Sequence, residues 1–156
     1  MGETIAIASD HRGVGLKAAV AGVLEGLGAV VLDMGPETDA SVDYPVYARK
    51  VAEAVSRGEC DRGVLICGSG IGMSIAANKF KGVRAALCHD ARTAEMCRRH
   101  NNANILVMGE SAGEPLARAM TSIWFETAFE GGRHQKRLDL IAGIEDDVFK
   151  ETPAHA

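Results

Sequence analysis

Short apolar runs alternate with longer segments of helical periodicity along the chain, and this alternation is the feature that most constrains the fold. Each short run is apolar along most of its length, which is typical of strands covered on both faces. Such an alternation favours a parallel sheet wrapped by helices. We therefore predict an α/β fold, a three-layer α/β/α sandwich of Rossmann-like type, with a five-stranded parallel sheet and an extra C-terminal helix.

The same periodicity gives the bounds of the expected elements. The predicted strands are residues 4–9, 29–33, 63–67, 83–88 and 104–108. The predicted helices are residues 14–27, 44–57, 72–79, 91–99, 112–126 and 133–149. With no repeat and no linker in the sequence, we interpret residues 1–149 as a single domain and residues 150–156 as a frayed tail.

Charge and cysteine content exclude several classes of protein. The chain has 17 Lys and Arg against 21 Asp and Glu, a net charge of −4. Nucleic acid and anionic lipid select basic surfaces, so we expect neither a nucleic-acid partner nor a membrane partner. No apolar run approaches a membrane span, and the N-terminus lacks the basic segment of a signal peptide. The four cysteines form no C-x-x-C pair, so reduced thiols and a cytoplasmic location are expected.

Polar and reactive side chains follow the predicted strands, where open parallel sheets bind their ligands. These candidate residues are Ser9, Asp10, His11, Tyr44, Cys67, Gly68, Ser69, His89, Asp90, Gly109, Glu110 and Ser111. We expect thiol, imidazole, carboxylate and hydroxyl groups to gather at one edge of the sheet.

A glycine-rich loop follows the third predicted strand and begins with a cysteine. Gly68, Gly70 and Gly72 would expose backbone N–H groups to an anion and favour the thiolate form of Cys67. Met73 stands where a dinucleotide fingerprint needs glycine and where a cysteine phosphatase needs arginine, so both are disfavoured. From the residues alone, Cys67 remains either a reactive thiol or a buried apolar residue that ends a strand.

Several segments together resemble one known family. They are IAIASDHRGVGLK, SVDYP, CGSGIGMSIAANK, VRAALCHD, HNNAN, VMG and FEGGRHQKR. They resemble the ribose-5-phosphate isomerase B family, with its allose- and galactose-6-phosphate isomerase relatives, through about residue 145. The resemblance implies a sugar-phosphate isomerase domain that acts through an enediolate in the non-oxidative pentose phosphate pathway, with no cofactor and no metal. It also implies a homodimer or dimer of dimers whose sites are shared between subunits.

The resemblance implies a role for each matching residue. Cys67 would be the general base, Ser69 would assist at the substrate oxygens, and His100 would open the furanose ring. The residues expected to bind substrate are Asp10, His11, Tyr44, Gly68, Gly70, Gly72, Asn101, Arg133 and Arg137. The two arginines are four residues apart, hence on one helix face, where they would hold the phosphate.

Alternative interpretations stand beside these roles. Arg133 and Arg137 could form a solvated face paired with Glu130 or Asp139, and His100 could be a capping histidine next to a left-handed Asn101. We expect His134 and His155 at the surface. Zinc on Cys88, Cys97 and His100 is disfavoured because their spacing matches no compact zinc motif. The alternative functions are isomerisation of a six-carbon sugar phosphate such as allose 6-phosphate and a non-catalytic sugar-phosphate binding subunit.

Overall fold

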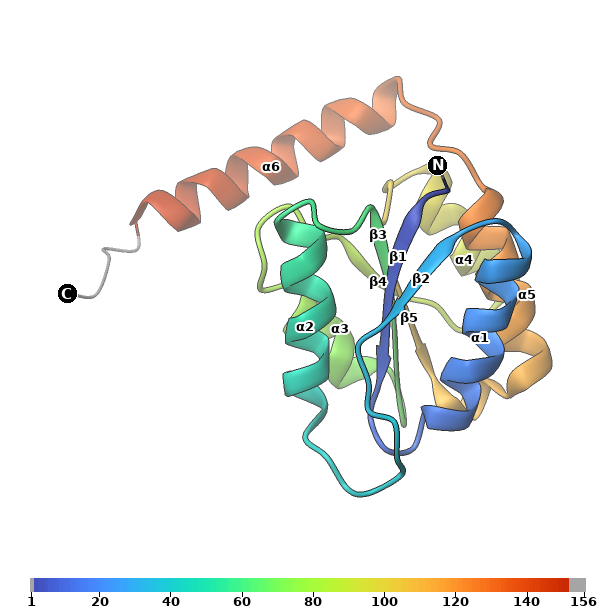
Figure 1. Ribbon diagram of the computed structural model, residues 1–156. Coiled ribbons are helices and arrows are strands. Elements are labelled where there is room, and N and C mark those ends of the chain that lie inside the picture. The colour runs from blue at the N-terminus through green and yellow to red at the C-terminus, as the bar shows by residue number, and fades with distance from the viewer. Residues whose placement is uncertain (1, 152–156) are drawn as a thin grey trace.

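The computed structural model describes residues 2–151 and contains one parallel sheet of five strands (Figure 1). The strands are β1 (Thr4–Ser9), β2 (Val30–Asp33), β3 (Arg62–Cys67), β4 (Ala85–Leu87) and β5 (Ile105–Gly109). Their order is β2-β1-β3-β5-β4, so the chain winds outward in opposite directions from the β1/β3 junction. The predicted α/β fold and its parallel sheet are confirmed, and the junction is the place where such sheets bind ligands.

Helices connect the strands. They are α1 (Val14–Gly26), α2 (Tyr44–Ser56), α3 (Ile71–Ala77), α4 (Ala91–Arg99), α5 (Glu114–Glu126) and α6 (Arg133–Glu151), with a 3-10 turn η1 (Glu110–Ala112) before α5. The helix predicted from residue 112 begins at Glu114 because Gly113 has φ 75°, outside the helical region. Residues 150 and 151 continue α6 instead of beginning the predicted tail. The remaining tail and His155 lie outside the described residues.

Helices cover both faces of the sheet (Figure 1), and an apolar core lies on each face. On one face α1, α4 and α5 cover the strands, and Trp124 is the largest side chain that is fully buried there. On the other face α2 and α3 cover the strands, with Met73 fully buried. Met73 is therefore a core residue beneath the glycine loop, which explains an apolar side chain at that position of the sequence.

The edge strand β2 departs from the prediction that every strand is covered on both faces. Val30 is 51% exposed and Leu32 is 43% exposed. An apolar run does not distinguish an edge strand from a central one, since the sequence contains no record of strand order.

Helix α6 lies beyond the amino ends of the strands and projects from the body of the molecule (Figure 1). An ion pair of 2.6 Å between Lys81 Nζ and Asp146 and a hydrogen bond of 2.8 Å from Gly82 N–H to Glu145 tie it to the loop before β4. Its apolar residues Leu140 and Ile144 are each 65% exposed. A groove of ≈ 610 Å³ runs between α6 and the β4 side of the sheet.

Candidate active site

The carboxyl ends of β1 and β3 bring the predicted reactive groups to one edge of the sheet. Ser9 is in register with Ile66, so Asp10 and Cys67 follow on neighbouring strands. The backbone N–H of Asp10 donates to Ile66 O at 3.0 Å, which joins the two strand ends. The expected carboxylate and thiol therefore lie on neighbouring strands at this end of the sheet.

Cys67 is the last residue of β3 and is 5% exposed. Its Sγ accepts a hydrogen bond of 3.1 Å from the backbone N–H of Gly70, which has φ 79° and turns the chain into α3. This contact fixes the sulfur at the start of the loop. The loop therefore uses one of its N–H groups on the cysteine instead of leaving it free for an anion.

Ser69 lies in the same loop, and its hydroxyl oxygen accepts a hydrogen bond of 3.2 Å from Ile71 N–H. This contact occupies an acceptor lone pair and leaves the hydroxyl proton free to donate. Ser69 lines a cavity of ≈ 340 Å³ together with His89 and Ser111. A polar oxygen atom of a ligand in this cavity would meet a donor.

Asp10 and His11 are held in place by the backbone. Asp10 is 7% exposed, and its carboxylate accepts from the N–H groups of Arg12 at 2.9 Å and Gly13 at 3.2 Å. His11 Nδ1 accepts from Val42 N–H at 3.2 Å. Because a neutral imidazole with Nδ1 as acceptor carries its proton on Nε2, His11 is set to donate from Nε2.

Tyr44, the first residue of α2, packs on the first turn of α3. A Cβ atom added to Gly72 would lie 2.5 Å from Tyr44 Cζ and 2.8 Å from its hydroxyl oxygen. A side chain at position 72 would therefore have to displace the ring, and Tyr44 lies against the helix that follows the Cys67 loop.

Arg12 is a neighbour of the loop that the sequence did not single out. A Cβ atom on Gly68 would lie 3.2 Å from Arg12 Nη1, and Arg12 Nε donates to Glu110 at 2.9 Å. The guanidinium therefore lies beside the Cys67 loop, anchored from the residue that follows β5. Its position directly after His11 in the DHRG segment was the available signal.

His100 lies near the amino ends of the strands, whereas Cys67 lies at their carboxyl ends. Helix α4 starts after the carboxyl end of β4 and returns to the amino ends, where Arg84, just before β4, donates from Nε to Asn101 O at 3.1 Å. In β3, Gly63 lies near the amino end and Cys67 at the carboxyl end. This separation of four residues spans about 13 Å along the strand, at roughly 3.3 Å per residue. One chain therefore does not bring its own His100 to its own Cys67.

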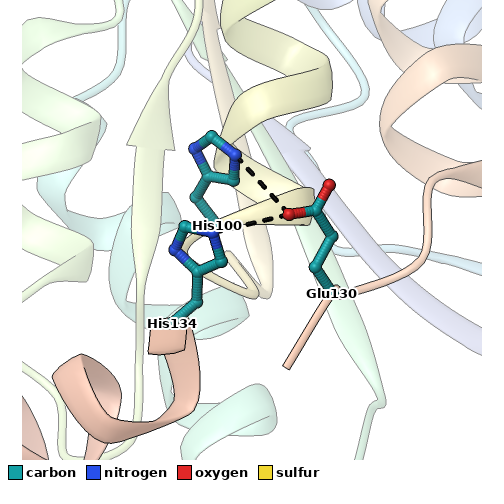
Figure 2. A group of neighbouring side chains, drawn as sticks. All are labelled: His100, Glu130 and His134. Atoms are coloured by element: carbon teal, nitrogen blue, oxygen red, sulfur yellow. Dashed lines mark ion pairs between the residues drawn. The ribbon is translucent and has the colours of Figure 1, made fainter. Parts of the chain in front are cut away.

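A cluster of ionisable side chains surrounds His100 (Figure 2). The ring of His100 stacks on that of His134 with centroids 4.2 Å apart and planes 12° apart. Glu130 Oε2 lies 3.8 Å from His100 Nε2 and 3.4 Å from His134 Nε2. Within residues 2–151, these three side chains form a group able to hold a metal ion, with ligand atoms within 4.8 Å of one another.

The prediction that His134 lies at the surface is wrong, because the residue is only 5% exposed. Burial is the main cause that lowers its pKa, and the nearby His100 and Arg133 lower it further. Glu130 instead has a lowered pKa, mainly because Arg99 donates to it from Nε at 2.6 Å. No helical periodicity links the members of this cluster, since Gly131 and Gly132 separate Glu130 from α6.

Arg133 and Arg137 lie in the first turns of α6, next to this cluster, and both are exposed. The pairing expected under the alternative interpretation is not found: Glu130 is bound by Arg99, and Asp139 accepts from Gln135 at 2.7 Å. With the described residues, neither arginine forms a hydrogen bond or an ion pair.

The expected left-handed cap after α4 is displaced by one residue. Asn102, with φ 45°, adopts it, and its N–H donates to Arg98 O at 3.1 Å. His100 is the C-cap of α4, with φ −102° and ψ −33° in the right-handed helical region, and Asn101 lines the groove beside α6. The prediction of Asn101 as the left-handed residue is therefore wrong, because the helical turn extends through His100.

Comparison with known proteins assigns this chain and its fold to a family. The family described as Ribose/Galactose Isomerase matches residues 5–141. A protein named putative sugar phosphate isomerase YwlF, from Bacillus subtilis, is 51% identical over 144 residues, covering 91% of this chain and 97% of its own. The structure of Clostridium thermocellum ribose-5-phosphate isomerase B superimposes with a TM-score of 0.90 at 49% identity, covering 93% of this chain and 99% of the other.

A further structure, ribose-5-phosphate isomerase B of Mycoplasma genitalium with bound ribulose-5-phosphate, has a TM-score of 0.89 at 41% identity. It covers 97% of this chain and 99% of its own. The fold and these relatives together define an α/β enzyme of the aldose–ketose isomerase class. The chain belongs to the ribose/galactose isomerase family and is a sugar-phosphate isomerase.

The helices within residues 2–151 include no candidate for a membrane span. None of them combines the length and the apolar character required to span a membrane.

Proposed function

We propose that the chain interconverts ribose 5-phosphate and ribulose 5-phosphate through an enediolate, as part of the non-oxidative pentose phosphate pathway. The observation that carries the proposal is the buried Cys67 thiol, held by Gly70 N–H at the carboxyl edge of the sheet. Support comes from the two similar structures named ribose-5-phosphate isomerase B, one of them with bound ribulose-5-phosphate.

Cys67 is the general base of the proposed reaction. As a thiolate it takes the proton from C2 of the open-chain aldose, and the electrons of that C–H bond form the C1–C2 double bond while the C1 oxygen becomes an oxyanion. The C2 hydroxyl proton then passes to the C1 oxyanion, which becomes the C1 hydroxyl and leaves the negative charge on the C2 oxygen. As this oxygen forms the ketose carbonyl, the electrons of the C1–C2 double bond take the proton back from sulfur to C1, and the thiolate is regenerated. A sugar C–H is a very weak acid, so donors to the enediolate oxygens must lower the barrier, each by roughly 3–4 kcal/mol when well placed.

Ser69 and the loop backbone supply those donors. The free hydroxyl proton of Ser69 donates to a substrate oxygen, and Gly68, Gly70 and Gly72 form the backbone of the loop that borders the sugar. Of the loop N–H groups, that of Gly70 supports the thiolate and that of Ile71 is given to Ser69. The loop thus divides its donors between base and substrate.

Asp10, His11 and Tyr44 line the sugar pocket in this proposal. Asp10 is fixed by two backbone N–H groups, so its remaining lone pairs accept from sugar hydroxyls. His11 donates from Nε2 toward the phosphate, and the Tyr44 ring forms the wall over Gly72.

The phosphate and ring-opening groups come from a second copy of the chain. Cys67 and His100 occupy opposite edges of one sheet, so a site containing both requires two subunits. The partner brings His100 for opening the furanose ring, Asn101 beside it, and Arg133 and Arg137 to hold the phosphate. The two arginines are exposed, and the apolar residues Leu140 and Ile144 offer α6 a surface to bury in a homodimer or a dimer of dimers.

The experiment that tests the function is a specificity comparison of ribose 5-phosphate with allose 6-phosphate by kcat/KM, in the parent and in Cys67→Ala. We expect ribose 5-phosphate to be preferred and Cys67→Ala to lose roughly 10²-fold or more in kcat. Cys60→Ala is the matched control, because Cys60 is also buried but lies in the turn before β3. Near-parental turnover by Cys67→Ala would rule out the thiol base.

A six-carbon sugar phosphate is the second candidate, because the family description includes galactose. Preference for allose 6-phosphate in the same comparison would establish it. No turnover of either sugar by the parent would instead favour a binding subunit.

A further inference from the structure

We propose that His100, Glu130 and His134 form a binding site for zinc or a chemically similar divalent ion. The three side chains come from the end of α4, from the loop after α5 and from the first turn of α6. Their ligand atoms lie within 4.8 Å of one another (Figure 2). Two imidazoles and one glutamate are a donor set that zinc enzymes use, with a fourth position left for water.

His134 is the observation that distinguishes this cluster from a chance group of surface residues. The residue is 5% exposed, and its Nε2 is buried without a hydrogen-bond partner among residues 2–151. It faces Glu130 Oε2 at 3.4 Å (Figure 2). A buried polar atom without a hydrogen bond costs free energy, and a metal ion bound at this nitrogen would remove that cost.

Glu130 is oriented to serve as a shared ligand. Arg99 binds its Oε1, with Nε at 2.6 Å, and is itself held by Glu95 at 2.9 Å. This pairing leaves Oε2 directed at both histidine Nε2 atoms. Hydrogen bonds of this kind to a metal-binding carboxylate fix its orientation and are a regular part of metal sites.

The ion requires a small rearrangement. The two rings are nearly parallel, and a metal binds an imidazole nitrogen in the plane of the ring, so both rings must tilt toward Glu130. His100 and Glu130 have side chains that are 37% and 36% exposed, which leaves room for this movement. Imidazole and carboxylate ligands without a thiolate favour zinc, cobalt, nickel or copper over magnesium or calcium.

Occupancy of the site would remove His100 from other chemistry. If His100 opens the sugar ring, a bound ion inhibits the isomerase, and this consequence rests on the proposed function. The binding itself does not depend on that function. Zinc would then act as a reversible inhibitor at the histidine and not at the catalytic thiol.

The test uses the full-length protein, with cobalt(II) as a spectroscopic substitute for zinc. Cobalt added to the reduced protein is expected to give visible d–d bands without the intense near-ultraviolet charge-transfer band of cobalt thiolate, and zinc should displace it. Glu130→Gln and His134→Gln should each weaken zinc binding, measured by calorimetry. Loss of a residue that only supports a metal ligand weakens binding by roughly 10–100-fold, and loss of a ligand should weaken it at least as much.

His89→Gln is the matched control, since His89 is an exposed histidine whose Nε2 lies 3.7 Å from Asp90 without a second imidazole. Its zinc affinity should equal that of the parent. Unchanged binding in both Glu130→Gln and His134→Gln, or a thiolate charge-transfer band in the parent, would overturn the site.

An activity measurement separates this inference from the proposed function. Zinc should inhibit turnover of ribose 5-phosphate reversibly, with relief by a chelator, and any activity retained by Glu130→Gln should be at least tenfold less sensitive. If the parent does not isomerise the sugar, the function fails while the cobalt spectrum still decides the metal site. If the parent isomerises but gives no cobalt spectrum, the metal site fails alone.

Discussion

The sulfur of Cys67 accepts a hydrogen bond from the backbone N–H of Gly70 at 3.1 Å. Gly70 has φ 79°, and a Cβ there would lie 2.5 Å from Leu87 Cδ1. Gly70→Ala should therefore displace the N–H from the sulfur and lower kcat by roughly tenfold or more, the effect of losing one hydrogen bond to a charged group. Steady-state kinetics on ribose 5-phosphate measure this, and parental kcat in a folded variant would contradict it.

The close contact of Gly72 with Tyr44 predicts a second effect. Gly72→Ala should push the ring away and raise KM for the sugar phosphate, because Tyr44 lines the proposed sugar pocket. Gly22→Ala is its control: Gly22 is exposed within α1, with nothing within 4 Å of an added Cβ. This control should raise the free energy of unfolding by about 1 kcal/mol and leave KM unchanged. Equal KM values in both variants would contradict the role of Tyr44.

In the proposed site, one subunit supplies Cys67 and the other supplies the arginines, so two inactive variants should complement each other. Cys67→Ala and Arg137→Ala should each be nearly inactive alone. Refolded together in equal amounts, they should recover about a quarter of parental activity, because half of the dimers are mixed and each mixed dimer has one intact site. Assays of the separate and mixed preparations measure this. No recovery, despite mixed dimers detected by mass spectrometry, would mean that one chain supplies the whole site.

The N-cap of α4 predicts a dependence of stability on pH. Asp90 Oδ1 accepts from Thr93 N–H at 2.7 Å, and this hydrogen bond is the main cause that lowers the pKa of the carboxyl. The ionised carboxylate therefore stabilises the folded state at pH values above its unfolded pKa of about 3.9. This stabilisation is lost as the pH falls through the lower pKa of the folded state. Asp90→Asn keeps an acceptor that does not titrate.

Urea unfolding of the parent and Asp90→Asn at about pH 6 and about pH 3 tests this dependence. The parent should lose more stability than Asp90→Asn between the two values. An equal loss in both proteins would show that the carboxylate does not couple to folding.

Trp124 predicts the cost of a large deletion in the core. It is fully buried, its indole N–H donates to Ala103 O at 3.2 Å, and the Arg62 guanidinium lies 4.6 Å from its ring centroid. Trp124→Ala should lower the free energy of unfolding by about 3–5 kcal/mol. Denaturant unfolding measures it, and Trp124→Phe should lose less because most of the volume is kept.

The sequence predicted most of the fold, because apolar runs and helical periodicity report local structure and burial directly. The predicted strand 4–9 and helix 91–99 match β1 and α4 residue for residue. It did not predict the exposure of Val30 or the burial of His134, since both depend on which elements become neighbours.

The site was predictable to a similar degree. Residues that follow strands, such as Asp10 and Cys67, could be grouped because parallel strands share one carboxyl edge. The location of His100 at the other end of the strands could not be predicted, because it depends on helix α4 returning across the sheet. The contact of Glu130 with His134 depends on the path of a loop, which has no periodicity in the sequence.

The separation of Cys67 from His100 across the sheet has a kinetic meaning for the proposed two-chain site. A lone chain would be folded but would hold only half of the reacting groups, so activity would be a property of the pair. The specific activity would fall upon dilution below the dissociation constant of the dimer, and at low abundance the cellular rate would rise with the square of the chain concentration.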